Sequence, residues 1–264
     1  MTNFIIEIVS DPVCPWCYIG KKRLDTAISL YLKTYPSARA NDTFAIHWRA
    51  FYLDPEAPKE GISWDARCRQ RLIAKHPQLQ SQSEGILDEQ VAALRANLAS
   101  RGLQDGISFS FAGKIGSTRS AHRAIALSRR LSLSSLPDSH SSSSSESHNH
   151  SGSRHHSTAQ DIYVTALFAA YFENDLDITS HTDLAAVATS SGLDGAQLLA
   201  WLDAGECGEE VDAEDREARA RGLVGVPHFT VLGHEIDGAK DVREFFELFV
   251  KIKEEEDEGW VQGG

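Results

Sequence analysis

Hydrophobic residues along the chain follow two periodicities, one typical of strands and the other of helices. Residues 4–9 form an almost continuous apolar run of β-branched and aromatic side chains, which predicts a buried strand. From Pro15 the apolar positions recur every three or four residues, at Ile19, Leu24, Ala27, Ile28, Tyr31 and Leu32. This spacing predicts a helix that ends near Pro36. Residues 44–53, rich in aromatics, then predict a second strand. A strand, a helix and a strand at this spacing form a βαβ unit with parallel strands.

Helical periodicity dominates the middle of the chain, from about residue 61 to residue 220. The predicted helical segments are residues 64–72, 86–98, 119–131, 161–172, 182–191 and 196–202. No convincing strand separates them, and residues 106–116 are a turn-rich connector. The pattern therefore predicts an all-helical region inserted into an α/β core.

The last part of the chain returns to strands. Residues 209–221 predict a charged helix, residues 226–232 a strand, and residues 235–237 a second strand after a tight turn. A final helix is expected from Asp241, as its N-cap, to about residue 253. Residues 254–258 are acidic and are expected to be a solvated tail.

These elements predict four segments in an α/β fold of the form βαβ, helical insertion, ββα. The first part of the α/β domain is expected at residues 1–58, the helical insertion at 59–208, the second part at 209–253 and the tail at 254–264. Residues 132–158 consist largely of Ser and His, so they cannot offset chain entropy by burying apolar surface and are expected to be a disordered loop. A weak metal site at this loop's histidines (His140, His148, His150, His155 and His156) is the less favoured alternative to a solvated linker.

Composition narrows the classes of partner. The chain has 264 residues, of which 41% are hydrophobic, so it can bury a core in one or two domains. Its net charge of −12 argues against nucleic acid and anionic membranes as partners. We find no secretory signal and no stretch long enough to span a bilayer, so a cytoplasmic location is expected. Disulfides there are usually transient and catalytic. A homodimer is left open.

The candidate chemistry lies at Cys14-Pro15-Trp16-Cys17, between the first strand and the first helix. Proline suits the first helical turn, so Cys14 should lie at the helix N-terminus, where unpaired N–H groups and the helix dipole favour an anion. We therefore expect Cys14 to be the thiolate nucleophile. Cys17, one turn inside, is expected to attack a mixed disulfide formed at Cys14.

A structural zinc site is the alternative reading of this C-x-x-C. Zinc needs about four ligands, and the chain has no second C-x-x-C, so no metal is expected here. The remaining cysteines, Cys68 and Cys207, lie apart in sequence and are interpreted as single thiols near helices. A C-x-x-C between a strand and a helix is the arrangement of thioredoxin-like redox proteins. The fold class is therefore a thioredoxin-like fold interrupted by a large helical insertion.

Several motifs together resemble one family. They are residues 10–21, Trp48 with Phe51, Leu53 and Pro55, and residues 121–123, 166–172, 191–194 and 222–229. The chain resembles the DsbA-like thioredoxin superfamily, in the FrnE-like branch related to 2-hydroxychromene-2-carboxylate isomerases. The resemblance implies a thioredoxin domain with an all-helical insertion. One departure is Ser117-Thr118, where this branch often has Asn before the Thr, so a polar contact made by that Asn is not expected here.

The resemblance favours a thiol–disulfide oxidoreductase that uses no cofactor and acts on protein or glutathione-like disulfides. Its substrate groove would involve Pro15, Trp16, Val226, Pro227 and His228, with Val226–Pro227 expected to be a cis peptide. A glutathione-dependent isomerase is the second hypothesis, but that branch typically has Ser at the nucleophile position and lacks the resolving thiol. A redox-regulated, chaperone-like binding module is the third.

Overall fold

Four strands form the central sheet in the part of the chain that the computed structural model describes, residues 1–81, 84–131 and 158–262. Their order is β2 (Thr43–Ala50), β1 (Asn3–Ser10), β5 (His228–Val231) and β6 (His234–Asp237). β1 and β2 are parallel and in register from Asn3↔Thr43 to Ser10↔Ala50, whereas β5 is antiparallel to both β1 and β6. The predicted βαβ and ββ units are therefore confirmed.

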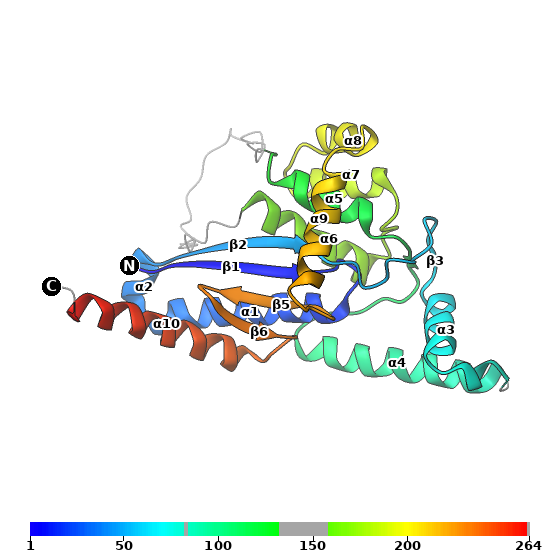
Figure 1. Ribbon diagram of the computed structural model, residues 1–264, viewed down its shortest axis with the longest axis horizontal. Coiled ribbons are helices and arrows are strands. Elements are labelled where there is room, and N and C mark those ends of the chain that lie inside the picture. The colour runs from blue at the N-terminus through cyan, green and yellow to red at the C-terminus, as the bar shows by residue number, and fades with distance from the viewer. Residues whose placement is uncertain (82–83, 132–157, 263–264) are drawn as a thin grey trace, which may run out of the picture.

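Two helices, α1 (Pro15–Thr34) and α10 (Val242–Gln262), pack together along one face of this sheet (Figure 1). Strand residues that alternate toward this face are fully buried, as the period of two requires. An aromatic cluster joins the layers: Phe4 stacks on Phe44 with ring centroids 4.6 Å apart, and Phe249 of α10 meets Phe4 edge-on at 5.3 Å. Tyr31 of α1 joins the same cluster, with its ring edge-on to Phe4 at 5.5 Å, so the cluster holds the C-terminal half of α1 against the sheet.

The insertion between β2 and β5 is mostly helical. Its helices are α3 (Trp64–Lys75), a 3₁₀ turn (Pro77–Ser81), α4 (Glu84–Gln104), α5 (Arg119–Ser128), α6 (Ala159–Asn174), α7 (His181–Ser190) and α8 (Gly195–Asp203), followed by α9 (Gly208–Ala220). α5, α6 and α9 contact β2, while α3 and α4 lie at one end of the molecule (Figure 1). None of the helices in the described residues is long and apolar enough to cross a bilayer.

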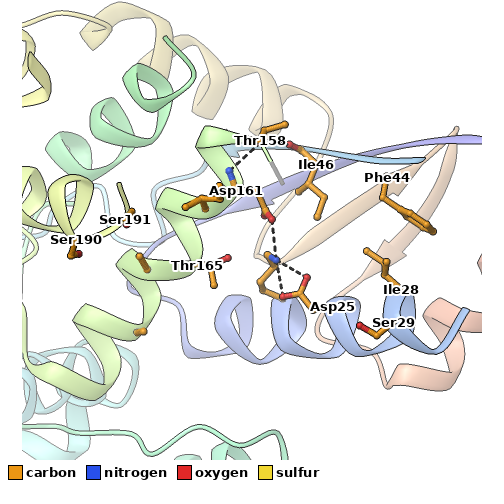
Figure 2. Close-up of a pocket in the computed structure, with 14 residues that line it drawn as sticks. Asp25, Ile28, Ser29, Phe44, Ile46, Thr158, Asp161, Thr165, Ser190 and Ser191 are labelled. Carbon is orange, nitrogen blue, oxygen red and sulfur yellow. Dashed lines mark hydrogen bonds and ion pairs between the residues drawn. The ribbon is translucent and has the colours of Figure 1, made fainter. Parts of the chain in front are cut away.

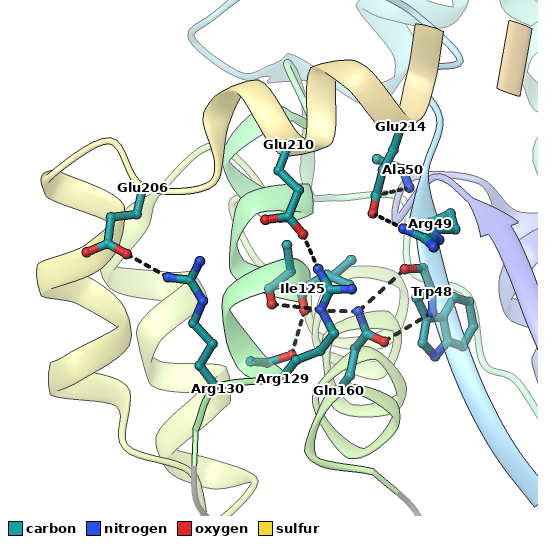
Figure 3. A network of polar contacts seen from close by, with 12 residues as sticks. Trp48, Arg49, Ala50, Ile125, Arg129, Arg130, Gln160, Glu206, Glu210 and Glu214 are labelled. Atoms are coloured by element: carbon teal, nitrogen blue, oxygen red, sulfur yellow. Dashed lines mark hydrogen bonds and ion pairs between the residues drawn. The ribbon is translucent and has the colours of Figure 1, made fainter. Parts of the chain in front are cut away.

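The outer edge of β2 is covered by side chains of the insertion over its C-terminal half (Figure 3). The Trp48 N–H donates to Gln160 Oε1 at 3.1 Å, and Gln160 Nε2 donates back to the Trp48 carbonyl at 3.4 Å. The Ala50 N–H donates to Glu214 Oε2 at 2.9 Å, while Glu214 Oε1 accepts from Arg49 at the same distance. These contacts satisfy backbone groups that would otherwise be left unpaired at a buried strand edge.

The structure corrects several sequence predictions. A short helix, α2 (Pro36–Asn41), follows α1 where a break was expected, and it begins with proline in its first turn. The insertion also contains a small antiparallel pair, β3 (Ile62–Ser63) with β4 (Lys114–Ile115), although no strand was expected there. Two-residue strands carry too little pattern to be recognised.

The structure also changes the description of two predicted polar segments, the acidic residues after 253 and the end of the Ser/His-rich loop. α10 continues to Gln262, so the acidic run after residue 253 belongs to a helix, although residues 254–256 are exposed to solvent as expected. Its carboxylates find partners, because Thr2 donates to Glu256 at 2.5 Å and His234 lies 3.3 Å from Glu255. Thr158, at the end of the predicted loop, is the N-cap of α6 and accepts from the Asp161 N–H. Residues 132–157, with the loop's five histidines, lie outside the described residues, and the four segment boundaries remain predictions.

Candidate functional site

The two cysteines of the C-x-x-C lie at the N-terminus of α1, shortly after the end of β1. Cys14 is the N-cap of α1, with extended backbone angles (φ −87°, ψ 112°), and Pro15 occupies the first helical turn as predicted. Cys17 lies one turn inside the helix, and its N–H donates to the Cys14 carbonyl at 3.0 Å. Both cysteines are free thiols and both are buried, at 3% and 1% exposure. Little of either cysteine is therefore exposed to solvent.

The loop before β5 lies directly against Cys14. The Val226–Pro227 peptide bond is cis, which confirms the sequence prediction. The Cys14 thiol donates to the Val226 carbonyl at 3.5 Å, so segments 212 residues apart in sequence meet at the sulfur. Pro227 is buried, whereas Val226 is only partly buried. Gly20 of α1 allows this approach, since a Cβ there would lie 3.3 Å from Pro227 Cγ and 3.0 Å from Phe229 Cζ.

Burial raises the pKa of the Cys17 thiol well above its usual value, and the neighbouring Cys14 raises it further. Hydrogen bonds from the Asp11 backbone and from the Ser10 side chain act in the opposite direction, because they stabilise a thiolate at Cys17. Cys17 therefore remains a protonated thiol while Cys14 is free. The part of this shift that is due to charge at Cys14 would disappear if the Cys14 sulfur were uncharged.

A buried carboxyl group and a buried imidazole lie beside the motif. Asp11 is 1% exposed, and burial raises its pKa to about 7 despite hydrogen bonds from the N–H groups of Leu53 (2.8 Å) and Val13 (3.3 Å). Burial lowers the pKa of His122 to about 4, and its Nε2 lies 3.2 Å from the Phe51 carbonyl.

His122 Nε2 also lies 3.8 Å from Asp11 Oδ1, a separation at which an ion pair is conceivable. Both pKa shifts run against an ion pair, because burial favours the uncharged form of each group. We therefore describe them as a neutral pair at weakly acidic pH. Sequence reasoning assigned neither residue a role. The only available signals were an Asp at the end of a buried strand and a His in a helix that resembles the family.

The other predicted groove residues surround this centre. Trp16 is partly buried, and the Arg101 guanidinium of α4 lies 5.3 Å from its ring centroid. Pro15 lines a small apolar cavity together with Phe109 and Tyr171. The insertion thus forms one wall beside the C-x-x-C, and the cis-proline loop forms the other.

His228 points away from α1. Its neighbour Phe229 contacts Gly20 of α1, and successive strand residues face opposite sides of a sheet. His228 is 5% exposed, its Nδ1 lies 2.6 Å from Asp237 Oδ1, and its Nε2 is buried without a hydrogen-bond partner. It lines a cavity of about 450 Å³ that also includes Val226 and Pro227. The structure therefore brings His228 to the cis-proline loop, on the far side from α1.

Comparison with known proteins identifies the family. A model of the DSBA-like thioredoxin domain matches residues 5–249. The chain belongs to this family. Among solved structures, a probable DsbA oxidoreductase from Streptomyces coelicolor is 24% identical, with a TM-score of 0.66, and the match covers 94% of this chain and 89% of that one. No curated protein matches the chain significantly.

Two further structures share the fold of this DsbA-like chain. A 2-hydroxychromene-2-carboxylate isomerase is 16% identical with a TM-score of 0.57, and the match covers 98% of this chain and all (100%) of that one. A putative protein disulfide isomerase from Nitrosomonas europaea is 12% identical with a TM-score of 0.57, covering 99% and 100% of the two chains. The thioredoxin-like fold with a helical insertion, expected from the sequence, is thus confirmed.

The remaining thiols of this DsbA-like chain, Cys68 and Cys207, belong to other elements than the C-x-x-C. Cys68 is on α3, where burial raises its pKa to about 11, and Cys207 precedes α9, where burial and Glu210 raise its pKa. Within the described residues, no group of three or more His, Cys, Asp or Glu side chains could hold a metal ion. Neither thiol joins the candidate site.

A larger cavity, of about 560 Å³, lies between α1, β2 and α6 (Figure 2). Its lining includes Lys21, which is 3% exposed and pairs with Asp25 at 2.6 Å and Asp161 at 3.3 Å. Figure 2 shows this ion-pair group bridging α1 and α6. Because neither cysteine of the C-x-x-C lines the cavity, we do not include it in the candidate site.

Proposed function

We propose that the protein is a thiol–disulfide oxidoreductase in which Cys14 is the nucleophile and Cys17 the resolving thiol. The observation that carries the proposal is the contact between the Cys14 sulfur, at the N-terminus of α1, and the Val226 carbonyl next to Pro227. Helix N–H groups on one side favour a thiolate at Cys14. The loop on the other side offers backbone groups to an extended peptide that pairs with it as an added strand.

In the reductive direction, the Cys14 thiolate attacks one sulfur of a substrate disulfide. A bond forms between the two sulfurs, the substrate S–S bond breaks, and the leaving thiolate takes a proton from solvent. Cys17 then loses its proton and attacks the Cys14 sulfur. This step releases the second substrate thiolate and leaves a Cys14–Cys17 disulfide. The substrate gains two electrons and the protein loses two; an excess of oxidised protein over a dithiol substrate drives the same steps in reverse.

The proposed substrates are protein disulfides or glutathione-like disulfides, with Pro15, Trp16, Val226 and Pro227 lining the approach to the sulfur. His228, the fifth proposed substrate-binding residue, would act from the other face of the cis-proline loop. Trp16 and Pro15 supply apolar surface, and the Val226 backbone supplies polar contacts. Cytoplasmic action is part of the proposal, because glutathione and thioredoxin there can reduce the Cys14–Cys17 disulfide.

Substitution of each cysteine tests the proposal. Cys14→Ser should lower the rate of insulin-disulfide reduction, with dithiothreitol as electron source, to that of dithiothreitol alone. Cys17→Ala should accumulate a covalent adduct between Cys14 and the substrate, because the resolving thiol is missing. Adducts are counted by mass spectrometry after acid quenching. Cys207→Ser is the matched control and should leave the rate unchanged. Catalysis by Cys14→Ser at the wild-type rate would refute the proposal.

A further inference from the structure

The cavity beside the cis-proline loop combines a buried histidine nitrogen that has no hydrogen-bond partner with exposed carboxylates. It has a volume of about 450 Å³, and Val226 and Pro227 line it, so it opens next to the residues that contact the Cys14 sulfur. This volume falls within the range of about 300–1,000 Å³ that is usual for ligand pockets. A side chain adjacent to a substrate cysteine bound at Cys14 is therefore within reach of it.

The polar groups around this cavity are mostly acceptors. Nδ1 of His228 lies 2.6 Å from Asp237 Oδ1, and its Nε2 is buried without a hydrogen-bond partner, 3.8 Å from Glu235 Oε1. In the tautomer whose Nδ1–H donates to Asp237, Nε2 is an acceptor. Glu235 and Asp237 also line the cavity, with 62% and 90% of their side chains exposed. A buried acceptor without a donor is unfavourable, and a ligand that brings an N–H donor would satisfy it.

The charge balance of the cavity favours a cation. Its lining contains one guanidinium, Arg221, which already lies 3.3 Å from Glu7 and 3.8 Å from Glu235. Asp237 is left with His228 as its partner. The chain as a whole carries a net charge of −12, which attracts basic polypeptides over longer distances.

We infer that this cavity is a subsite for a lysine or arginine next to the reactive cysteine of a polypeptide substrate. The basic side chain donates to His228 Nε2 and pairs with Glu235 and Asp237, while the substrate backbone lies along Val226. The inference rests on the proposed function and adds a substrate class to it. It makes Glu235 and Asp237 specificity-determining residues for exchange at Cys14.

Three peptides that differ only in the residue after a single cysteine (Lys, Gln or Glu) test the subsite. Each is prepared as a mixed disulfide with 5-thio-2-nitrobenzoate, whose release reports attack on the peptide sulfur. The second-order rate constant with the reduced protein is divided by that with 2-mercaptoethanol, which corrects for the intrinsic reactivity of each peptide. We expect the corrected rate for Lys to exceed that for Glu about fivefold, as two partly exposed ion pairs allow.

Variants and salt then assign the preference to this cavity. Glu235→Gln combined with Asp237→Asn should bring the Lys-to-Glu ratio close to one, and His228→Phe should lower it. Glu89→Gln, an exposed residue on α4, is the control for loss of a negative charge and should keep the wild-type ratio. High salt should lower the ratio of the unmodified protein, a result that does not depend on how a variant folds.

The outcomes separate the two proposals. If no peptide reacts faster with the protein than with Cys14→Ser, the proposed function fails. If all three react at the same corrected rate through Cys14, the function stands and the subsite is refuted. A faster reaction with the Glu peptide would also overturn the inference, because the cavity would then be an anion site.

Discussion

Replacing Asp11 by Asn should make the protein more stable at alkaline pH although it alters a buried hydrogen-bonded residue. Burial raises the pKa of Asp11 from 3.8 to about 7. The native state therefore binds more protons than the unfolded state between these values, and the free energy of unfolding falls as the pH rises through this window. The full loss is about 4 kcal/mol, of which about 3 kcal/mol falls between about pH 5 and about pH 8.

The amide of Asn cannot ionise, so it avoids this loss, but it keeps only one acceptor oxygen. Asp11 accepts from Leu53 through Oδ2 and from Val13 through Oδ1, and the variant would lose the weaker of these bonds at about 1–2 kcal/mol. At about pH 5 the loss of the bond and the avoided ionisation nearly cancel. At about pH 8 the variant should be more stable than the wild type by about 3 kcal/mol.

Urea unfolding followed by far-ultraviolet circular dichroism at several pH values measures this difference, with a phosphine reductant to keep all thiols reduced. His122 has a pKa lowered to about 4, so its contribution is lost as the pH falls from about 6.5 to about 4. Because that contribution is common to both proteins, it cancels in the difference. Asp88→Asn, at a carboxylate with 53% of its side chain exposed, should give an offset independent of pH. An equally flat offset for Asp11→Asn would refute the neutral state of this carboxyl group.

Two further substitutions test contacts that position the site. Glu214→Gln should lower the free energy of unfolding, measured in urea, by about 1–3 kcal/mol, because the single oxygen of the amide cannot accept both hydrogen bonds at the β2 edge. Glu210→Gln, at a more exposed ion pair on the same helix, is the control and should change it by less than about 1 kcal/mol. Gly20→Val should lower the melting temperature and slow disulfide exchange, since its added atoms collide with the buried Phe229 ring. Gly85→Val, with no atom within 4 Å of the added Cβ, should do neither. Equal effects within either pair would contradict the structure.

The sequence predicted the layers better than the chemistry around the cysteines. Long periodic segments such as α1 and α10 were recognised because their buried face repeats over several turns. The N-cap position of Cys14 followed from Pro15 and the preceding strand. The pKa values of Asp11 and His122, in contrast, depend on burial by residues from distant segments, which a linear pattern does not contain.

The sequence also did not predict which way the side chains of the short strand β5 point. Of residues 226–232, which were predicted as a strand, only His228–Val231 form β5; Val226 lies in a bend and Leu232, at φ 45°, in the following turn. A period of two also does not say which of the two faces of the strand meets α1. Phe229 takes that place, against Gly20, so that His228 faces the other side and pairs with Asp237. The four-residue β5 carries too few side chains for composition to decide between its faces.

The hydrogen bonds at the β2 edge also bear on whether the α/β part and the inserted helices can fold separately. Gln160 and Glu214, from α6 and α9, take the place of a neighbouring strand for Trp48 and Ala50. Removing residues 59–208 would leave the Trp48 N–H without its acceptor in the remaining chain and Gln160 without its partners in the excised segment, while Glu214 would stay with Ala50. We expect neither fragment to fold alone. A shortened version would have to keep Gln160, however much of the rest of residues 59–208 was removed.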